Sequence, residues 1–88
     1  MKKILLVTTE GCEGCKIINN LITQALESYN DIELEVVDKQ EVNNKFLKAH
    51  YVNDFPATFL IKDGQVKFVF TGTRPVPVIV RYIDINLM

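Results

Sequence analysis

Apolar and polar positions follow one another along this chain in an order that predicts alternating strands and helices. Residues 2–8 contain four consecutive apolar side chains, a run typical of a strand that is buried on both faces. In residues 32–37 glutamates alternate with aliphatic residues, which predicts a second strand. Between these strands, residues 12–29 repeat their apolar side chains at helical spacing. They predict an amphipathic helix with an inner face of Ile18, Leu21, Ile22, Ala25 and Tyr29.

The second half of the chain predicts a helix, a hairpin and a final helix. Residues 38–51 are expected to be helical, because Asp38 can cap the first turn. Strands at 58–61 and 66–70 flank Asp63-Gly64, a dipeptide typical of a tight β-hairpin. The last helix is expected to begin at about Pro75, since proline suits a first helical turn. The inner faces of these two helices would consist of Val42, Phe46, Leu47 and His50, and of Val76, Ile79, Val80, Ile83 and Leu87.

This order, βαβα followed by a hairpin and a helix, predicts an α/β fold. The first βαβ unit should be parallel with a right-handed crossover, and the hairpin is antiparallel, so the four-stranded sheet should be mixed. Apolar faces on all three helices imply that helices cover both sides of the sheet. With 88 residues and no linker or repeat, we expect residues 1–88 to form a single domain.

Composition and charge limit the classes of function that this chain could have. Apolar residues make up 48% of the chain and charged residues 24%, as in ordinary soluble globular proteins. A formal net charge of −1 provides no field that would attract nucleic acid or anionic lipid. The first apolar run ends at Val7, too early for a signal peptide, and no segment has the roughly 18 apolar residues of a membrane span. We therefore expect a cytoplasmic monomer without nucleic-acid or membrane partners.

The chain has only two cysteines, Cys12 and Cys15, and their spacing points to chemistry. Residues three apart at a helix start lie on one face, within the Cα separation of roughly 4.4–6.8 Å that a disulfide needs. A helix N-terminus presents free N–H groups and partial positive charge, which stabilise a thiolate. Cys12, at the entry, should face solvent and act as the nucleophile. Cys15 should be more buried and act as the resolving thiol.

Other interpretations of the pair remain open at this point. The two cysteines could be inert core thiols, or they could be ligands of a metal ion. Zinc requires four ligands, however, and His50 is the only other soft or imidazole ligand in the chain. We therefore expect neither a metal site nor a bound cofactor.

A second position of interest is Phe55-Pro56, which lies 41 positions after Cys15 and just before a predicted strand. A cis peptide bond there would turn the loop and expose the backbone of Phe55, with which an extended substrate could pair. Only about 5–6% of X–Pro bonds are cis, so the local sequence does not establish this geometry.

With these residues in view, the chain resembles the thioredoxin/glutaredoxin superfamily over nearly its whole length. The resemblance rests on Leu5-Leu6-Val7, Cys12-Glu13-Gly14-Cys15-Lys16, Tyr51-Val52-Asn53-Asp54-Phe55-Pro56-Ala57-Thr58, Lys62-Asp63-Gly64 and Thr71-Gly72. It implies a minimal βαβαββα thioredoxin fold in which Cys12 attacks a substrate disulfide and Cys15 resolves the mixed disulfide. It also implies a cis Pro56 against the cysteines, and a Gly72 that lets a substrate backbone approach. Phe55, Pro56 and Gly72 are thus the expected substrate-binding residues.

Two departures from thioredoxins concern the surroundings of the cysteines. Gly11 stands where thioredoxins usually have a tryptophan, and Leu6 stands where they usually keep a buried acid. Proton uptake by Cys15 must therefore use another group or water. We expect a protein-disulfide reductase that receives electrons from an external thiol or flavoprotein reductase. The alternatives are a glutathione-dependent oxidoreductase of the glutaredoxin type, and a thioredoxin-fold binding module without redox turnover.

Overall fold

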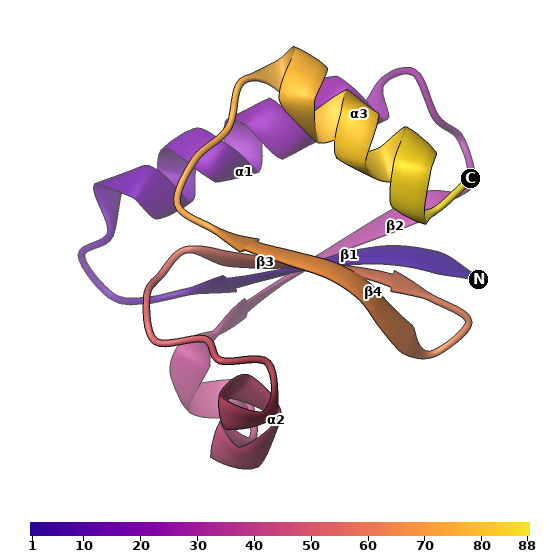
Figure 1. Cartoon of the computed structure of the whole chain (residues 1–88). Coiled ribbons are helices and arrows are strands. Elements are labelled where there is room, and N and C mark those ends of the chain that lie inside the picture. Colours follow the sequence, from indigo (N-terminus) through magenta and orange to yellow (C-terminus); the bar gives the residue numbers. More distant parts are fainter.

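A computed structural model describes residues 1–88 and contains the predicted elements in the predicted order (Figure 1). The strands are β1 (Lys2–Thr8), β2 (Ile32–Asp38), β3 (Ala57–Lys62) and β4 (Gln65–Thr71). The helices are α1 (Glu13–Leu26), α2 (Asn44–Ala49) and α3 (Val76–Asn86), with a 3₁₀ turn, η1 (Lys39–Glu41), before α2. The strands form one sheet in the order β2-β1-β3-β4. Only the β1–β2 pair is parallel, so the sheet is mixed, as expected.

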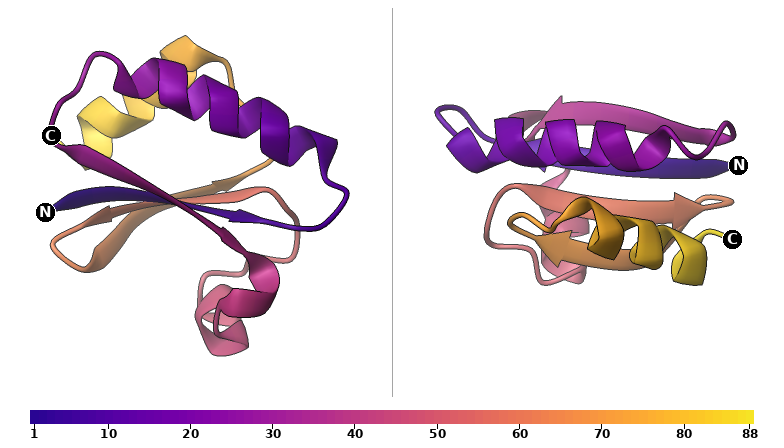
Figure 2. Two further views of the ribbon diagram at one scale, coloured as in Figure 1. Left: turned by 180° about the vertical axis from the view of Figure 1, so that it is seen from behind. Right: turned by 90° about the horizontal axis from the view of Figure 1, so that it is seen from above.

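Helices cover both faces of this sheet, which confirms the predicted layering. Helices α1 and α3 lie side by side on one face, and α2 lies on the other (Figures 1 and 2). Seen from above, α1 runs over β1 and β2, and α3 runs over β3 and β4 (Figure 2). The larger apolar cluster lies beneath α1 and α3 and includes Ile4, Leu6 and Ile22, while the smaller one lies beneath α2 around Phe59.

The register of the central strands decides which side chains lie beneath α1. Leu6 of β1 is paired with Thr58 of β3, and Thr58 is paired with Phe70 of β4. Leu6 and Phe70 both belong to the cluster under α1 and α3. Because side chains of paired residues point to the same face, Thr58 faces α1 and α3 as well.

The hairpin between β3 and β4 has the predicted tight turn. Asp63 and Gly64 have φ values of 53° and 80°, and a turn with positive φ at both central residues matches the twist of the flanking strands. The amino terminus also holds this turn, since the Met1 N–H₃⁺ group donates a hydrogen bond to Asp63 Oδ1 at 2.6 Å. This ion pair holds the pKa of Asp63 below its usual value.

Two helices are shorter than predicted. Helix α1 ends at Leu26, so Tyr29 is not helical. Tyr29 reaches the core from the following turn instead, and its hydroxyl donates a hydrogen bond to Asp84 Oδ1 of α3 at 2.6 Å. Its apolar ring thus contributes to the core without a helical backbone, which is why its spacing misled the prediction.

The predicted helix over residues 38–51 is divided into η1 and α2. Asp38 does act as a cap, but of η1, where its Oδ1 accepts from Gln40 N at 2.9 Å. Asn43 then starts α2, and its Oδ1 accepts from Lys45 N at 2.8 Å. Because a capping residue has extended backbone angles, a second cap interrupts the helix. None of the helices is both long enough and apolar enough to span a membrane.

Candidate active site

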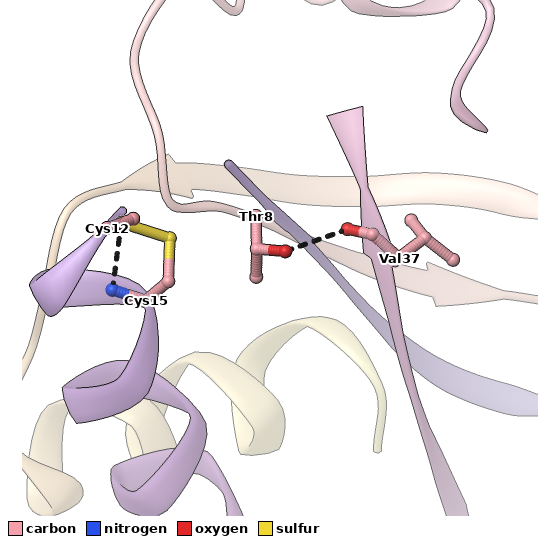
Figure 3. Close-up of a disulfide and its surroundings, with 4 residues drawn as sticks. All are labelled: Thr8, Cys12, Cys15 and Val37. Atoms are coloured by element: carbon pink, nitrogen blue, oxygen red, sulfur yellow. Dashed lines mark hydrogen bonds between the residues drawn. A yellow bond between two sulfur atoms is a disulfide. The ribbon is translucent and has the colours of Figure 1, made fainter. Parts of the chain in front are cut away.

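The two cysteines are joined as a disulfide at the start of α1 (Figure 3). Cys12 is the residue that caps the helix, and Cys15 lies in its first turn, with 5.3 Å between their Cα atoms. The backbone N–H of Cys15 donates a hydrogen bond to Cys12 Sγ at 3.0 Å. The same N–H group would stabilise a negative charge on Cys12 Sγ when the disulfide opens, together with the partial positive charge at the helix start.

The two sulfur-bearing side chains differ in their access to solvent. Cys12 is half-buried, whereas only 6% of Cys15 is exposed. An open pocket beside the disulfide is lined by both cysteines and by Thr8, Thr9, Gly11, Glu13, Lys16 and Asn19. Thr8, at the end of β1, lines this pocket, and its hydroxyl points away from the disulfide to donate a hydrogen bond to the Val37 carbonyl of β2 at 3.3 Å (Figure 3).

Pro56 lies against the segment between the cysteines. A β-carbon placed on Gly14 would stand 3.5 Å from Pro56 Cδ, which is ordinary van der Waals contact. The Phe55–Pro56 peptide bond is cis, and Pro56 is buried. The structure thus brings Pro56 beside the cysteine pair although 41 positions separate it from Cys15.

Gly72 lies next to Pro56 on the neighbouring strand end. Its N–H donates a hydrogen bond to the Pro56 carbonyl at 2.8 Å, and its φ is +80°, a conformation that favours glycine. A β-carbon at Gly72 would meet only Arg74 Nη1, at 3.9 Å, so the space beside it is open. Arg74 Nη1 donates hydrogen bonds to the Thr71 and Thr73 carbonyls, and the guanidinium lies over the Phe70 ring.

The backbone of Phe55 is unpaired, since no intramolecular hydrogen bond uses its N–H or its carbonyl. Its half-buried ring is partly covered by Lys39, whose Nζ lies 5.5 Å from the ring centroid. A larger pocket on this side, between η1 and α2, is lined by Phe55 with Lys39, Gln40, Asn44, Lys48 and Asn53 among others. It contains no cysteine, so the thiol chemistry of the site lies at the smaller pocket beside the disulfide.

Charged groups near the disulfide are all exposed. Glu10 precedes the pair, Glu13 lies within it and Lys16 follows it. No three His, Cys, Asp or Glu side chains gather in a way that could hold a metal ion. His50 lies at the end of α2, where its ring packs edge-on against Phe46 and Phe59 in the smaller cluster.

The sequence predicted no role for Thr58, although it belongs to the segment that carries the resemblance. It is the only polar residue among the 18 buried ones, and its hydroxyl has no hydrogen-bond partner. The signal was present, because Thr58 is an isolated hydroxyl in a predicted apolar strand, two residues after Pro56. Without the register against Leu6, however, nothing indicated which face of the sheet it occupied.

A comparison with protein-family models matches residues 2–85 to the thioredoxin family. A comparison with curated proteins gave no match. Among solved structures, thioredoxin-2 described as a component of the malaria parasite protein secretion machinery superposes with a TM-score of 0.80. It is 16% identical, and the alignment covers 98% of this chain and 84% of that one.

Two further solved structures are similar. Mitochondrial thioredoxin 3 from Saccharomyces cerevisiae, in its oxidized form, gives a TM-score of 0.74 at 24% identity, over 94% of this chain and 77% of that one. A malarial protein gives 0.79 at 17% identity, over 100% and 99%. At these identities the likeness establishes the fold, and it agrees with the mixed sheet and helix layers described above.

Proposed function

Because the chain belongs to the thioredoxin family, we propose that it reduces disulfide bonds of protein substrates through the Cys12–Cys15 pair. Membership of the family and the bonded pair at a helix start make it a thiol–disulfide oxidoreductase in general terms. The observation that carries the finer proposal is the arrangement at the start of α1. A half-buried cysteine whose sulfur accepts a backbone N–H is bonded to a buried cysteine, and Pro56 lies beside Gly14 between them.

Cys12 is the attacking thiol in this proposal. Its thiolate attacks one sulfur of the substrate disulfide, so that a Cys12–substrate bond forms and the other substrate sulfur leaves as a thiolate. The Cys15 N–H, 3.0 Å from Cys12 Sγ, and the start of the 14-residue helix α1 stabilise the attacking charge. The half-buried position of Cys12 allows a protein-sized disulfide to reach it.

Cys15 resolves the mixed disulfide. Its thiolate attacks Cys12 Sγ, the bond to the substrate breaks, and the second substrate thiol is released. Two electrons have then passed from the cysteine pair to the substrate, and the pair is again a disulfide. The burial of Cys15 suits this role, because it keeps the resolving sulfur away from other disulfides in solution while leaving it within bonding distance of Cys12.

Phe55, Pro56 and Gly72 are the proposed substrate-binding residues. The unpaired N–H and carbonyl of Phe55 are available to an extended substrate segment. The open space at Gly72 allows that segment to approach the sheet closely. Pairing with main-chain groups holds many sequences equally well, which suits an enzyme that acts on different proteins.

The test is reduction of insulin disulfides with dithiothreitol as electron donor. The parent protein should accelerate insulin reduction, Cys12→Ser should be inactive, and Cys15→Ser should form mixed disulfides without turnover. Titration of the reduced protein with limiting iodoacetamide should label Cys12 first. Preferential labelling of Cys15, or equal insulin reduction by Cys12→Ser, would contradict the assignment.

The same protein preparation can be used to identify the electron donor, which we propose to be an external thiol or flavoprotein reductase. We further propose that the protein is cytoplasmic and that residues 1–88 form a single, monomeric domain. Activity that depends on glutathione and glutathione reductase would instead identify a glutaredoxin-type enzyme. Absence of any turnover, with intact binding to a partner, would identify a binding module.

A further inference from the structure

We propose that the Thr58 hydroxyl donates a hydrogen bond to Cys15 Sγ once the disulfide opens, and so positions and stabilises the resolving thiolate. This inference deepens the function proposed above and rests on the role of Cys15 as the resolving thiol. Thr58 is a positioning residue in this scheme, because it acts through Cys15 and does not contact substrate.

The first observation is an unused donor at a fully buried position. Thr58 is 0% exposed, and its Oγ1 has no hydrogen-bond partner in the oxidised protein. A buried hydroxyl without a partner is costly, and the great majority of buried polar groups are paired. An apolar residue of the same shape, such as valine, would avoid this cost, so a hydroxyl at this position calls for a partner in another state of the protein.

The second observation is where the hydroxyl lies. Register places Thr58 beside Leu6 on the face of the sheet that α1 covers. Thr8, two residues after Leu6 on the same face of β1, lines the pocket of the disulfide (Figure 3). Pro56, two residues before Thr58, lies beside Gly14 between the cysteines, where a β-carbon on Gly14 would be 3.5 Å from Pro56 Cδ. These neighbours on the same face of the sheet indicate that the Thr58 side chain lies beneath the start of α1.

The third observation concerns what Cys15 lacks. Its Sγ takes part in no hydrogen bond, whereas Cys12 Sγ accepts the Cys15 N–H. The charged groups that line the pocket, Glu13 and Lys16, are both exposed on α1. No ionisable side chain is buried near it, since Thr58 is the only buried polar residue. Thr58 is therefore the only fully buried residue whose side chain could donate to a thiolate on Cys15, and the Thr8 hydroxyl of the disulfide pocket is already bonded to the Val37 carbonyl.

The chemistry follows from these placements. When Cys15 attacks the mixed disulfide, its proton passes to water in the open pocket, and Thr58 keeps its own proton throughout. Hydrogen bonds to a charged acceptor are about twice as strong as those to a neutral one, so the hydroxyl favours the thiolate over the thiol. Loss of the hydroxyl should therefore slow resolution and leave the attack by Cys12 unchanged.

The experiment uses Ellman's reagent, a small aromatic disulfide, with the reduced protein. Cys12 attacks the reagent and releases a first thionitrobenzoate, and Cys15 then attacks Cys12 Sγ and releases the second. For Thr58→Val we expect the second release to be about tenfold slower at neutral pH. The pH at which it reaches half its maximal rate should rise by about one unit. The first release should change less than about twofold.

Two matched pairs of proteins separate the effect of the Thr58 hydroxyl from the effect of side-chain packing. Threonine and valine have the same shape, and Thr58→Ser and Thr58→Ala also differ only in the hydroxyl. Serine should preserve the fast second release and alanine should not, even if the valine variant folds poorly. Oxidised Thr58→Val should be at least as resistant to urea as the parent, because its unpaired hydroxyl has been removed.

Two results would overturn the inference. The first is a second thionitrobenzoate release in Thr58→Val that has the parental rate and pH profile. The second is an equal rate of second release in Thr58→Ser and Thr58→Ala. Cys15→Ser, which should lose the second release alone, checks the premise. Because the reagent is a small disulfide, a failure to reduce insulin would refute the proposed function and leave this measurement intact.

Discussion

Pro56 lies beside Gly14 across the active site, at a spacing that leaves room for one methyl group: a β-carbon placed on Gly14 would stand 3.5 Å from Pro56 Cδ. This relationship joins the helix that bears the cysteines to the loop that precedes β3. Together with the hydrogen bond from Gly72 N–H to the Pro56 carbonyl, it places one element from each third of the chain around the disulfide.

The first prediction is that Gly14→Ala stabilises the protein. Gly14 lies in the first turn of α1 with ordinary helical geometry, and the added methyl group fits against Pro56 without displacement. We expect a gain of about 0.5 kcal/mol in the free energy of unfolding, because alanine reduces the conformational freedom of the unfolded chain. Urea denaturation measures it. Gly14→Val, whose side chain extends further toward Pro56, should lose this gain. A Gly14→Ala variant that is less stable than the parent would contradict the predicted fit of the methyl group against Pro56.

The second prediction separates the two glycines that have φ of +80°, Gly72 beside Pro56 and Gly64 in the hairpin. Each has open space at its β-carbon, so alanine should cost both variants about 1–2 kcal/mol through backbone strain alone. Only Gly72→Ala should also reduce the rate of insulin reduction, since its methyl group would occupy the proposed substrate path. Equal activity in the two variants would remove Gly72 from the substrate site.

The third prediction concerns the reduction potential. Glu13 lines the pocket with both cysteines, and its negative charge disfavours a thiolate on Cys12. A less stable reduced form makes the disulfide harder to reduce. Glu13→Gln should therefore make the potential less negative by on the order of 10 mV, because exposed charges are screened. Redox titration against glutathione measures the shift. Glu27→Gln, at the far end of α1, should leave it unchanged, and a more negative potential in Glu13→Gln would refute the argument.

The fourth prediction is a loss of stability at alkaline pH caused by Tyr29. Partial burial and the hydrogen bond to Asp84 raise the pKa of Tyr29 to about 12, and burial is the larger of these two causes. A pKa raised on folding means that the folded state prefers the neutral phenol. The stabilisation is therefore complete below about pH 10, the unfolded value, and is lost as the pH rises toward 12.

Comparison with Tyr29→Phe isolates this contribution. At pH 8 the variant should be less stable by about 1 kcal/mol, through loss of the hydrogen bond to Asp84. This difference should shrink between pH 10 and 12 in urea denaturation. Tyr51, which is 91% exposed, provides the control, and Tyr51→Phe should match the parent at every pH. A difference that stays constant across the interval would show that the Tyr29 phenol does not titrate as described.

Local sequence determined much of this protein. The apolar run before Thr8, the helical spacing from Ile18 to Ala25 and the Asp63-Gly64 turn each produced the predicted element, because backbone geometry and burial act over a few residues. The cysteine pair at a helix start was likewise predictable, and resemblance to a family added Pro56 at its side. Where two local signals competed, as with the caps Asp38 and Asn43, the prediction of one long helix was wrong.

Only the tertiary structure decided what surrounds the cysteines. Thr58 lies beside Leu6 because β3 pairs antiparallel with β1 in one particular register, and a shift of one residue would turn its hydroxyl to the α2 face. The position of Pro56 beside Gly14 likewise depends on the packing of α1 over the sheet. These relationships join residues about 40 to 50 positions apart. They follow from how complete strands pair and how the helices cover them, so no short stretch of sequence contains them.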